Sequence, residues 1–128
     1  ISYYSSFQTI EIVSKKKSTE ELQKREEGQL IIKKIADADS VILLDEKGKE
    51  FSSIEFSKFI EKHRLNSTKN IVFVIGGAYG FSEEVYKRAN HKMSLSKMTF
   101  PHQLVRIIFA EQLYRAFTIL KREKYHHE

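Results

Sequence analysis

Two short, almost continuously apolar runs constrain the fold more than any other feature of the chain. They are "SVILL", residues Ser40–Leu44, and "NIVFVI", residues Asn70–Ile75. Such runs are typical of strands that are buried on both faces of a parallel sheet. Further short strands are predicted at "TIEIV", residues Thr9–Val13, and around Met93–Leu95. The sequence therefore predicts a sheet whose central strands have no solvent-facing side.

Helical stretches separate the predicted strands. A capping box, in which a serine is followed three residues later by a glutamate, opens the first stretch at Ser18 and the second at Ser52. Ser82 is predicted to cap a third helix, and Pro101 or His102 to begin the last one. The predicted helices are 18–36, 52–64, 82–89 and 101–121. This alternation predicts an α/β domain with a mostly parallel sheet flanked by helices.

Composition excludes several classes of protein. The 128 residues are expected to form one domain, 1–128, and 41% apolar with 30% charged residues is the mixture of a globular protein. The absence of cysteine excludes a disulfide scaffold, a thiolate metal site and a cysteine nucleophile. No apolar run approaches the roughly 18 residues of a membrane span, and no signal segment opens the chain. A cytoplasmic location without a membrane partner is expected.

Positive charge is concentrated toward the C-terminus. From Val85 onward the chain has nine Lys or Arg residues against three acids, and four of its five histidines lie there as well. This distribution indicates a polyanionic partner, and a solvated basic surface is the equally weighted alternative. The four histidines, which lack the spacing of helical metal ligands, are His91, His102, His126 and His127. No metal is therefore expected.

Three loops follow the predicted strands and meet at one edge of the sheet. They are "DEKGK" after Leu44, "GGAYGFS" after Ile75 and "SKMTFPH" after Leu95. Because ligands of open parallel sheets bind outside the carboxyl ends of the strands, these loops are the predicted binding site. The glycines of the middle loop allow close approach of a ligand, but their spacing matches neither the dinucleotide fingerprint nor a P-loop. A tight structural turn is the alternative for that loop.

The last predicted helix is apolar on two sides. The line predicted to face the core comprises Leu104, Val105, Ile108, Phe109, Gln112, Leu113, Ala116, Phe117 and Leu120. A second, weaker line comprises Ile107, Ala110, Tyr114 and Thr118. A helix buried on two sides predicts that a second subunit covers one of them, the alternative being a loop of the same chain. Glu111, the only acid in the middle of the helix, is expected to form a buried ion pair with an arginine such as Arg115.

The loops and the last helix carry a resemblance to a known family. The segments "FVIGGAYGFS", "SLSKMTFPHQLVRIIFAEQLYRAFTI" and the terminal "YHHE" resemble, in this order, the ribosomal large-subunit pseudouridine N3-methyltransferases of the RlmH type. These enzymes are a branch of the SPOUT methyltransferases, and the resemblance runs from about Tyr4 to the C-terminus. Family members begin with a strand and a helix ahead of "IEIV". Since the chain starts at Ile1 rather than Met, the first strand and most of the first helix are expected to be missing from it.

The resemblance implies a fold, a cofactor and partners. SPOUT enzymes have a deep trefoil knot in the C-terminal part of an α/β domain, bind S-adenosylmethionine there and work as homodimers. The implied cofactor-binding residues are Leu44, Gly76, Leu95, Ser96, Lys97, Met98, Thr99 and Phe100. The implied reaction is methylation of N3 of a pseudouridine in helix 69 of 23S rRNA, on the ribosome. The alternatives are a SPOUT methyltransferase for another RNA position, such as a ribose 2′-oxygen, and a non-catalytic ribosome-binding module.

The C-terminal tail "KREKYHHE" is the predicted contact with the target base. In the family that the chain resembles, the terminal Tyr-His reaches the active site, which implies that Tyr125 and His126 position the base. The residues predicted to hold rRNA phosphates are Arg106, Arg115 and Lys124. A frayed, solvated terminus is the alternative. The sequence does not name the general base that removes the N3 proton, and His102 is equally well explained as a helix cap.

Overall fold

The computed structural model describes residues 6–11, 19–65, 70–76 and 80–121. Strands and helices alternate along the chain, in the order β1 (Ser6–Glu11), α1 (Glu20–Lys34), β2 (Ser40–Glu50), α2 (Ser53–Leu65), β3 (Asn70–Ile75), α3 (Glu83–Arg88), β4 (His91–Ser94) and α4 (His102–Leu120). The strands form one four-stranded sheet in the order β1-β3-β2-β4, and every neighbouring pair is parallel. The predicted α/β architecture with a parallel sheet is confirmed.

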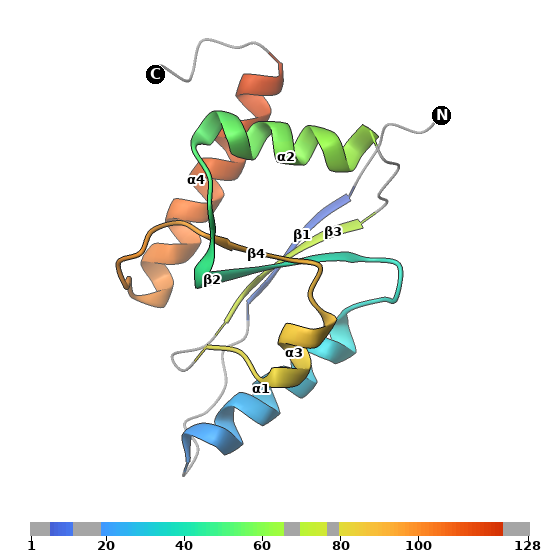
Figure 1. The fold of residues 1–128 in the computed structure, drawn as a ribbon, viewed down its shortest axis with the longest axis vertical. Helices are drawn as coiled ribbons and strands as arrows, with labels where there is room; N and C mark the ends of the chain where they lie inside the picture. Colours follow the sequence, from blue (N-terminus) through green and yellow to red (C-terminus); the bar gives the residue numbers. More distant parts are fainter. Residues whose placement is uncertain (1–5, 12–18, 66–69, 77–79, 122–128) are drawn as a thin grey trace.

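Helices cover both faces of the sheet (Figure 1): α1 and α3 lie on one side, and α2 and α4 on the other. Alternate residues of the central strands face the two sides. The first core cluster, toward α1 and α3, comprises Ile10, Ile31, Val41, Leu43, Val72, Val74, Phe81 and Val85. The second, toward α2 and α4, comprises Ile42, Phe56, Ile60, Ile71, Phe73, Met93, Phe109 and Ala116. After their first residues, Ser40 and Asn70, the two runs "SVILL" and "NIVFVI" are apolar because successive side chains enter the two cores in turn.

Side-chain caps fix where the helices begin. The capping box that opens α2 is confirmed: the backbone N of Glu55 donates to Ser52 Oγ at 3.1 Å, and the backbone N of Ser52 donates to Glu55 Oε1 at 2.8 Å. Ser82 caps α3, as predicted, by accepting from the backbone N of Val85. In α1 the cap is Thr19, whose Oγ1 accepts from the backbone N of Leu22 at 3.1 Å. The prediction of Ser18 as the cap was therefore wrong by one residue.

Strand β2 continues to Glu50, although a loop was predicted after Leu44. Leu44 and Lys49 both lie opposite Met93 of β4, so the residues between them form an irregularity in the pairing. Gly48 makes this possible, because a Cβ there would lie 2.6 Å from the backbone N of Met93 and 2.7 Å from the backbone C of Lys92. The bulged segment of β2 therefore packs directly against the backbone of β4.

A buried carboxylate organises the amino edge of the sheet. Asp39 is only 7% exposed, and its carboxylate accepts from the backbone N of Ala36 at 2.9 Å and from Asn70 Nδ2 at 3.1 Å. The guanidinium of Arg88 donates to the carbonyl oxygens of Ala36 and Asp39. The side chain of Asn90 accepts from the backbone N of Val41 at 2.8 Å. These bonds join the starts of β2, β3 and β4 and leave the opposite edge to the loops.

Helix α4 packs against α2 and β3 with one side and leaves the other open. Phe109 and Ala116 are buried, and Gln112 Oε1 accepts from Ser53 Oγ of α2 at 2.8 Å. Two predicted positions were wrong: Leu104, assigned to the core line, is 41% exposed, and Thr118, assigned to the second line, is 3% exposed. The exposed apolar line consists of Leu104, Ile107, Ala110 and Tyr114. In the described part of the chain, no helix is both long and apolar enough to cross a membrane.

Candidate active site

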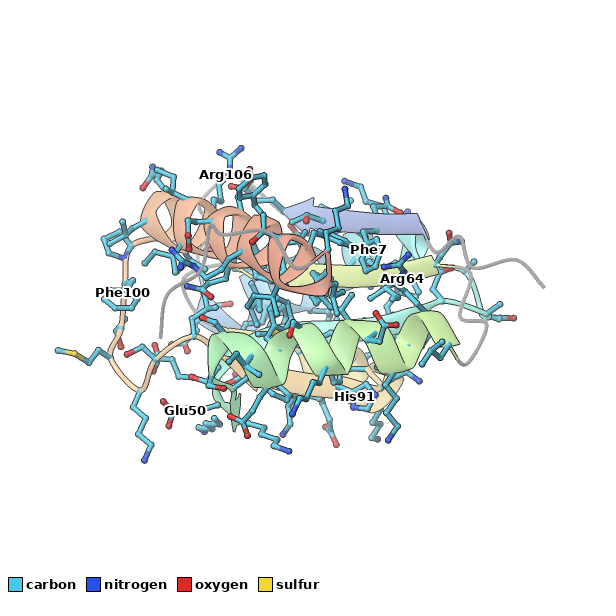
Figure 2. All side chains as sticks on the ribbon, turned by 90° about the horizontal axis from the view of Figure 1, so that it is seen from above. Phe7, Glu50, Arg64, His91, Phe100 and Arg106 are labelled. Atoms are coloured by element: carbon cyan, nitrogen blue, oxygen red, sulfur yellow. The ribbon has the colours of Figure 1, made fainter. Side chains whose placement is uncertain are left out.

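A cavity of about 380 Å³ lies at the carboxyl ends of β2, β3 and β4. This is the edge at which the three loops were predicted to meet. Figure 2 shows Phe100, in the segment that precedes α4, at the end of the molecule where this cavity lies. The lining residues are Leu44, Asp45, Glu46, Lys47, Ile75, Gly76, Gly80, Phe81, Tyr86, Ser94, Leu95, Ser96, Met98, Thr99, Phe100 and Val105.

A tyrosine and an aspartate meet in the wall of the cavity. The hydroxyl of Tyr86, on α3, donates to Asp45 Oδ2, and Asp45 Oδ1 accepts from the backbone N of Lys47 at 2.8 Å. Burial raises the pKa of Tyr86 to about 12, and the hydrogen bond to Asp45 and the charge of that carboxylate act in the same direction. The phenol therefore remains protonated at neutral pH and keeps the Asp45 carboxylate in place.

A second carboxylate ties the bulge of β2 to the loop before α4. Thr99 Oγ1 donates to Glu46 Oε1 at 2.8 Å. Within the loop, Ser94 Oγ donates to the carbonyl oxygen of Ser96 at 2.7 Å, and the backbone N of Met98 donates to Ser96 Oγ at 3.0 Å. These bonds shape residues 95–100 into one wall of the cavity.

The glycine turn after β3 has a structural explanation of its own. A Cβ on Gly76 would lie 2.7 Å and 2.8 Å from two ring atoms of Phe81, which belongs to the first core cluster. Gly80 has φ of 83°, a conformation that other residues rarely adopt. The described part of this turn therefore favours the tight structural turn that was the alternative prediction, and it still forms part of the cavity wall.

Seven of the eight residues predicted to bind the cofactor line this cavity. The exception is Lys97, which is 85% exposed and has its Nζ 3.8 Å from Glu50 Oε1. Their role in binding stays a prediction. Sequence reasoning missed Asp45, Glu46 and Tyr86 as individual residues. The two acids lie in the "DEKGK" segment that was recognised, whereas no local pattern marks Tyr86.

The residues predicted to contact rRNA are less closely grouped. Figure 2 shows Arg106 on the outer side of α4, beside β1, where its Nε lies 2.6 Å from Glu11 Oε2. Arg115 Nη2 lies 2.6 Å from Glu111 Oε1, which confirms the predicted pair. The prediction that this pair is buried was wrong, because both side chains lie on a partly exposed side of α4. Lys124, Tyr125 and His126 lie outside the described residues. In the ranges that the structure describes, no group of three or more His, Asp or Glu residues is placed to hold a metal ion.

Comparison with known proteins decides the family. A family model described as "Predicted SPOUT methyltransferase" matches residues 1–126. The chain belongs to the SPOUT methyltransferases. Membership in this family implies the C-terminal trefoil knot that the resemblance had implied.

Several SPOUT methyltransferases are similar to this chain over almost its whole length. The chain is 56% identical to a Ribosomal RNA large subunit methyltransferase H of Christiangramia forsetii, over 99% of this chain and 83% of the relative. It is 56% identical to a protein of the same name from Parabacteroides distasonis, over 92% of this chain and 75% of the relative. A third, from Flavobacterium psychrophilum, is 52% identical over 100% of this chain and 83% of the relative.

Proposed function

We propose that this SPOUT methyltransferase transfers a methyl group from S-adenosylmethionine to N3 of a pseudouridine in helix 69 of 23S rRNA, on the ribosome. Relatives that are 52–56% identical carry the name Ribosomal RNA large subunit methyltransferase H. The observation that carries the proposal is the cavity at the carboxyl ends of β2, β3 and β4, whose wall contains most of the residues that the resemblance implied.

The cavity fits S-adenosylmethionine in size and in charge. About 380 Å³ is within the range of pockets that hold small ligands. Leu44, Ile75 and Phe100 offer apolar surface to an adenine ring. Among the described residues of the wall, two acids, Asp45 and Glu46, stand against one cation, Lys47, which favours a ligand with a positive charge over one with phosphates. S-adenosylmethionine supplies an electrophilic methyl group on a positively charged sulfur.

The residues of the chain would bind and orient both reactants. The Tyr86–Asp45 and Thr99–Glu46 bonds hold two carboxylates at fixed places in the wall, so that binding requires little reorganisation. In the proposal, Tyr125 and His126 position the target base. N3 of the base carries a proton, which a general base has to remove before methyl transfer.

We extend the proposal to a homodimer formed through α4. Ile107 is 66% exposed and Tyr114 is 56% exposed, and together with Leu104 and Ala110 they form an apolar line on the open side of the helix. A stable dimer buries on the order of 1,200–2,000 Å² in total, more than one line of side chains, so neighbouring elements would contribute as well. Exposed apolar lines of this kind mark interaction surfaces.

The assay pairs cofactor binding with methyl transfer. Calorimetric titration with S-adenosylmethionine should show one site, and Asp45→Asn should weaken binding by about tenfold through loss of a nearby negative charge. Asp37→Asn is the matched control, since Asp37 is exposed and lies outside the cavity. Equal affinities of both variants and the unmodified protein would contradict the placement of the cofactor.

Substrate choice separates the remaining alternatives. Ribosomes, naked rRNA and tRNA are incubated with radiolabelled S-adenosylmethionine, and the modified nucleoside is identified by mass spectrometry. N3-methylpseudouridine from ribosomes supports the proposal. A ribose-methylated nucleoside would instead favour the other SPOUT activity, and cofactor binding without transfer to any RNA would favour a non-catalytic module.

A further inference from the structure

A second cavity, of about 880 Å³, lies beside β4 and shares no residue with the first. Its position is marked in Figure 2 by His91, which lies beneath α2 and well away from Phe100. We call it the β4 groove. It is lined by Asp37, Ala38, Asp39, Ser40, Lys49, Phe51, Phe59, Lys62, His63, Asn90, His91, Lys92 and Met93. The family comparison gives this surface no role.

Four rings form a continuous aromatic surface in the β4 groove. The ring centroids of Phe59 and His91 lie 5.1 Å apart in an edge-to-face arrangement, and those of Phe59 and His63 lie 4.4 Å apart. Phe51 extends the surface, at 5.2 Å from Phe59. His91 is exposed and Phe59 and His63 are half-buried, so the rings are accessible from solvent. His63 Nδ1 lies 3.0 Å from the carbonyl oxygen of Phe59, which fixes the orientation of its ring.

Two lysines, Lys49 and Lys62, lie beside the aromatic surface, and a third, Lys92, lines another part of the groove. Lys49 and Lys62 are exposed, and Lys49 Nζ lies 5.2 Å from the centroid of the Phe51 ring. Lys92 is also exposed, and its Nζ lies over Tyr86. The residues that the structure describes provide no carboxylate within ion-pair distance of these three lysines. Their charges therefore face solvent.

His91 lies close enough to His63 and Lys62 to be affected by their charges. The pKa of His91 lies below its ordinary value because of burial and, next, repulsion from His63 and Lys62. Two acids also line the groove. The carboxylate of Asp39 is buried and bonded to Ala36 and Asn70, and that of Asp37 is exposed. Both carboxylates oppose an anionic ligand, but among the described residues that line the groove they are outnumbered by three lysines, Lys49, Lys62 and Lys92.

We propose that the β4 groove binds a single-stranded segment of RNA, with a base stacked on the exposed ring of His91, which Phe59 supports by its edge-to-face contact, and the flanking phosphates held by Lys49 and Lys62. Stacking surfaces interleaved with cations are the physical basis of single-strand recognition, because every base has a flat face and every nucleotide a charge. The groove would hold rRNA at a second place, apart from the target base. The inference rests on the proposed function in taking rRNA as the substrate.

Two matched double variants test the phosphate contacts. Lys49→Ala/Lys62→Ala removes two charges from the groove, and Lys33→Ala/Lys34→Ala removes two exposed charges from α1, on the far side of the sheet. Binding of fluorescein-labelled oligouridine and of 23S rRNA is followed by fluorescence anisotropy over a range of salt concentrations. The groove variant should flatten the log–log salt dependence by about 1.4, at about 0.7 for each phosphate contact on a single strand. The α1 variant should change it by much less.

A pair of single substitutions tests stacking. His91→Ala should weaken oligouridine binding by about fivefold or more, and His91→Tyr should restore it, because tyrosine keeps a flat ring. S-adenosylmethionine affinity should be the same in all variants, which shows that they are folded. Full binding by both the groove double variant and His91→Ala, or equal losses in the groove and α1 double variants, would overturn the inference.

Methyl transfer separates this inference from the proposed function. If ribosomes are methylated at N3 and the groove variants bind RNA like the unmodified protein, the groove assignment alone is wrong. If neither ribosomes nor any RNA are methylated or bound, both assignments are wrong. A loss of affinity for ribosomes without any loss for oligouridine or 23S rRNA would instead identify the groove as a contact for a ribosomal protein, and would also overturn the RNA inference.

Discussion

Replacing Gly48 with alanine should destabilise the protein strongly, because the added methyl group meets the backbone of β4. The nearest atoms to a Cβ at this position are the backbone N of Met93 at 2.6 Å and the backbone C of Lys92 at 2.7 Å. Backbone cannot turn aside as a side chain can, so β4 has to shift by several tenths of an ångström. Overpacking of this kind costs about 1–3 kcal/mol. Weakened pairing of Lys49 with Met93 and of Glu50 with Ser94 adds about 1 kcal/mol.

Thermal unfolding followed by circular dichroism measures this effect. A loss of about 3 kcal/mol in a chain of this length lowers Tm by roughly 10 °C. Gly80→Ala is the matched control: its φ of 83° makes alanine unfavourable by about 1 kcal/mol, but among the described residues a Cβ there would have no neighbour closer than 4.0 Å. Gly48→Ala should also weaken S-adenosylmethionine binding, because Asp45 and Glu46 belong to the same bulge. A Tm for Gly48→Ala at or above that of Gly80→Ala would refute the reasoning.

Three further predictions concern the helix, the tyrosine and the tail. Ile107→Lys, at an exposed position, should leave Tm of the monomer nearly unchanged and convert a dimer into a monomer in light scattering; a particle of unchanged mass would argue against the α4 seam. The raised pKa of Tyr86, about 12 in the folded protein, stabilises the fold fully below the ordinary value near 10, and this contribution is lost as pH rises through about 12. Denaturant unfolding should thus show the unmodified protein losing more stability than Tyr86→Phe between these pH values, and parallel curves would mean that the pKa of Tyr86 is not raised in the folded protein. Removal of Tyr125–Glu128 should leave S-adenosylmethionine affinity intact and reduce methylation of ribosomes by orders of magnitude; full activity would mean that the tail is not needed.

Elements whose signal is local were predicted well from the sequence. Ser52 with Glu55, and Ser82 with the backbone N of Val85, form the caps that their spacing predicts. The strand Asn70–Ile75 has the predicted ends because its apolar run is bounded on both sides. Where two neighbouring residues can serve equally, as Ser18 and Thr19 can, the pattern does not distinguish them, and the fold selects one.

Features that depend on distant contacts were not predicted. The continuation of β2 to Glu50 requires β4 as a partner, and "DEKGK" by itself has the composition of a loop. Leu104 was predicted to be buried and is exposed, whereas Thr118 was predicted to lie outside the core line and is buried. Helix periodicity gives the width of an apolar face but not the angle at which α2 packs on it. Tyr86 reaches Asp45 from another element, so no local motif could mark it.

The candidate site was likewise predictable only in part. The edge of the sheet at which the cavity lies was predictable, because a general property of parallel sheets places it there. The identity of most lining residues came from the resemblance rather than from spacing. The β4 groove could not be predicted from the sequence, because Phe59 and His63 belong to α2 and His91 to β4, and the fold brings them together.

The sheet order has a consequence for how the molecule folds. Among the described residues, β1 is the first strand, and it pairs with β3, with Ser6 opposite Asn70. It therefore cannot form this pairing until a strand far along the sequence is available. In the sequence, β2 is likewise separated from its partner β4 by α2, β3 and α3. Pairings of such long range make folding slow, because each closes a large loop before it gains any contact. During synthesis, β2 and β3 can therefore associate before β4 and α4 exist, and the wall of the cavity closes last.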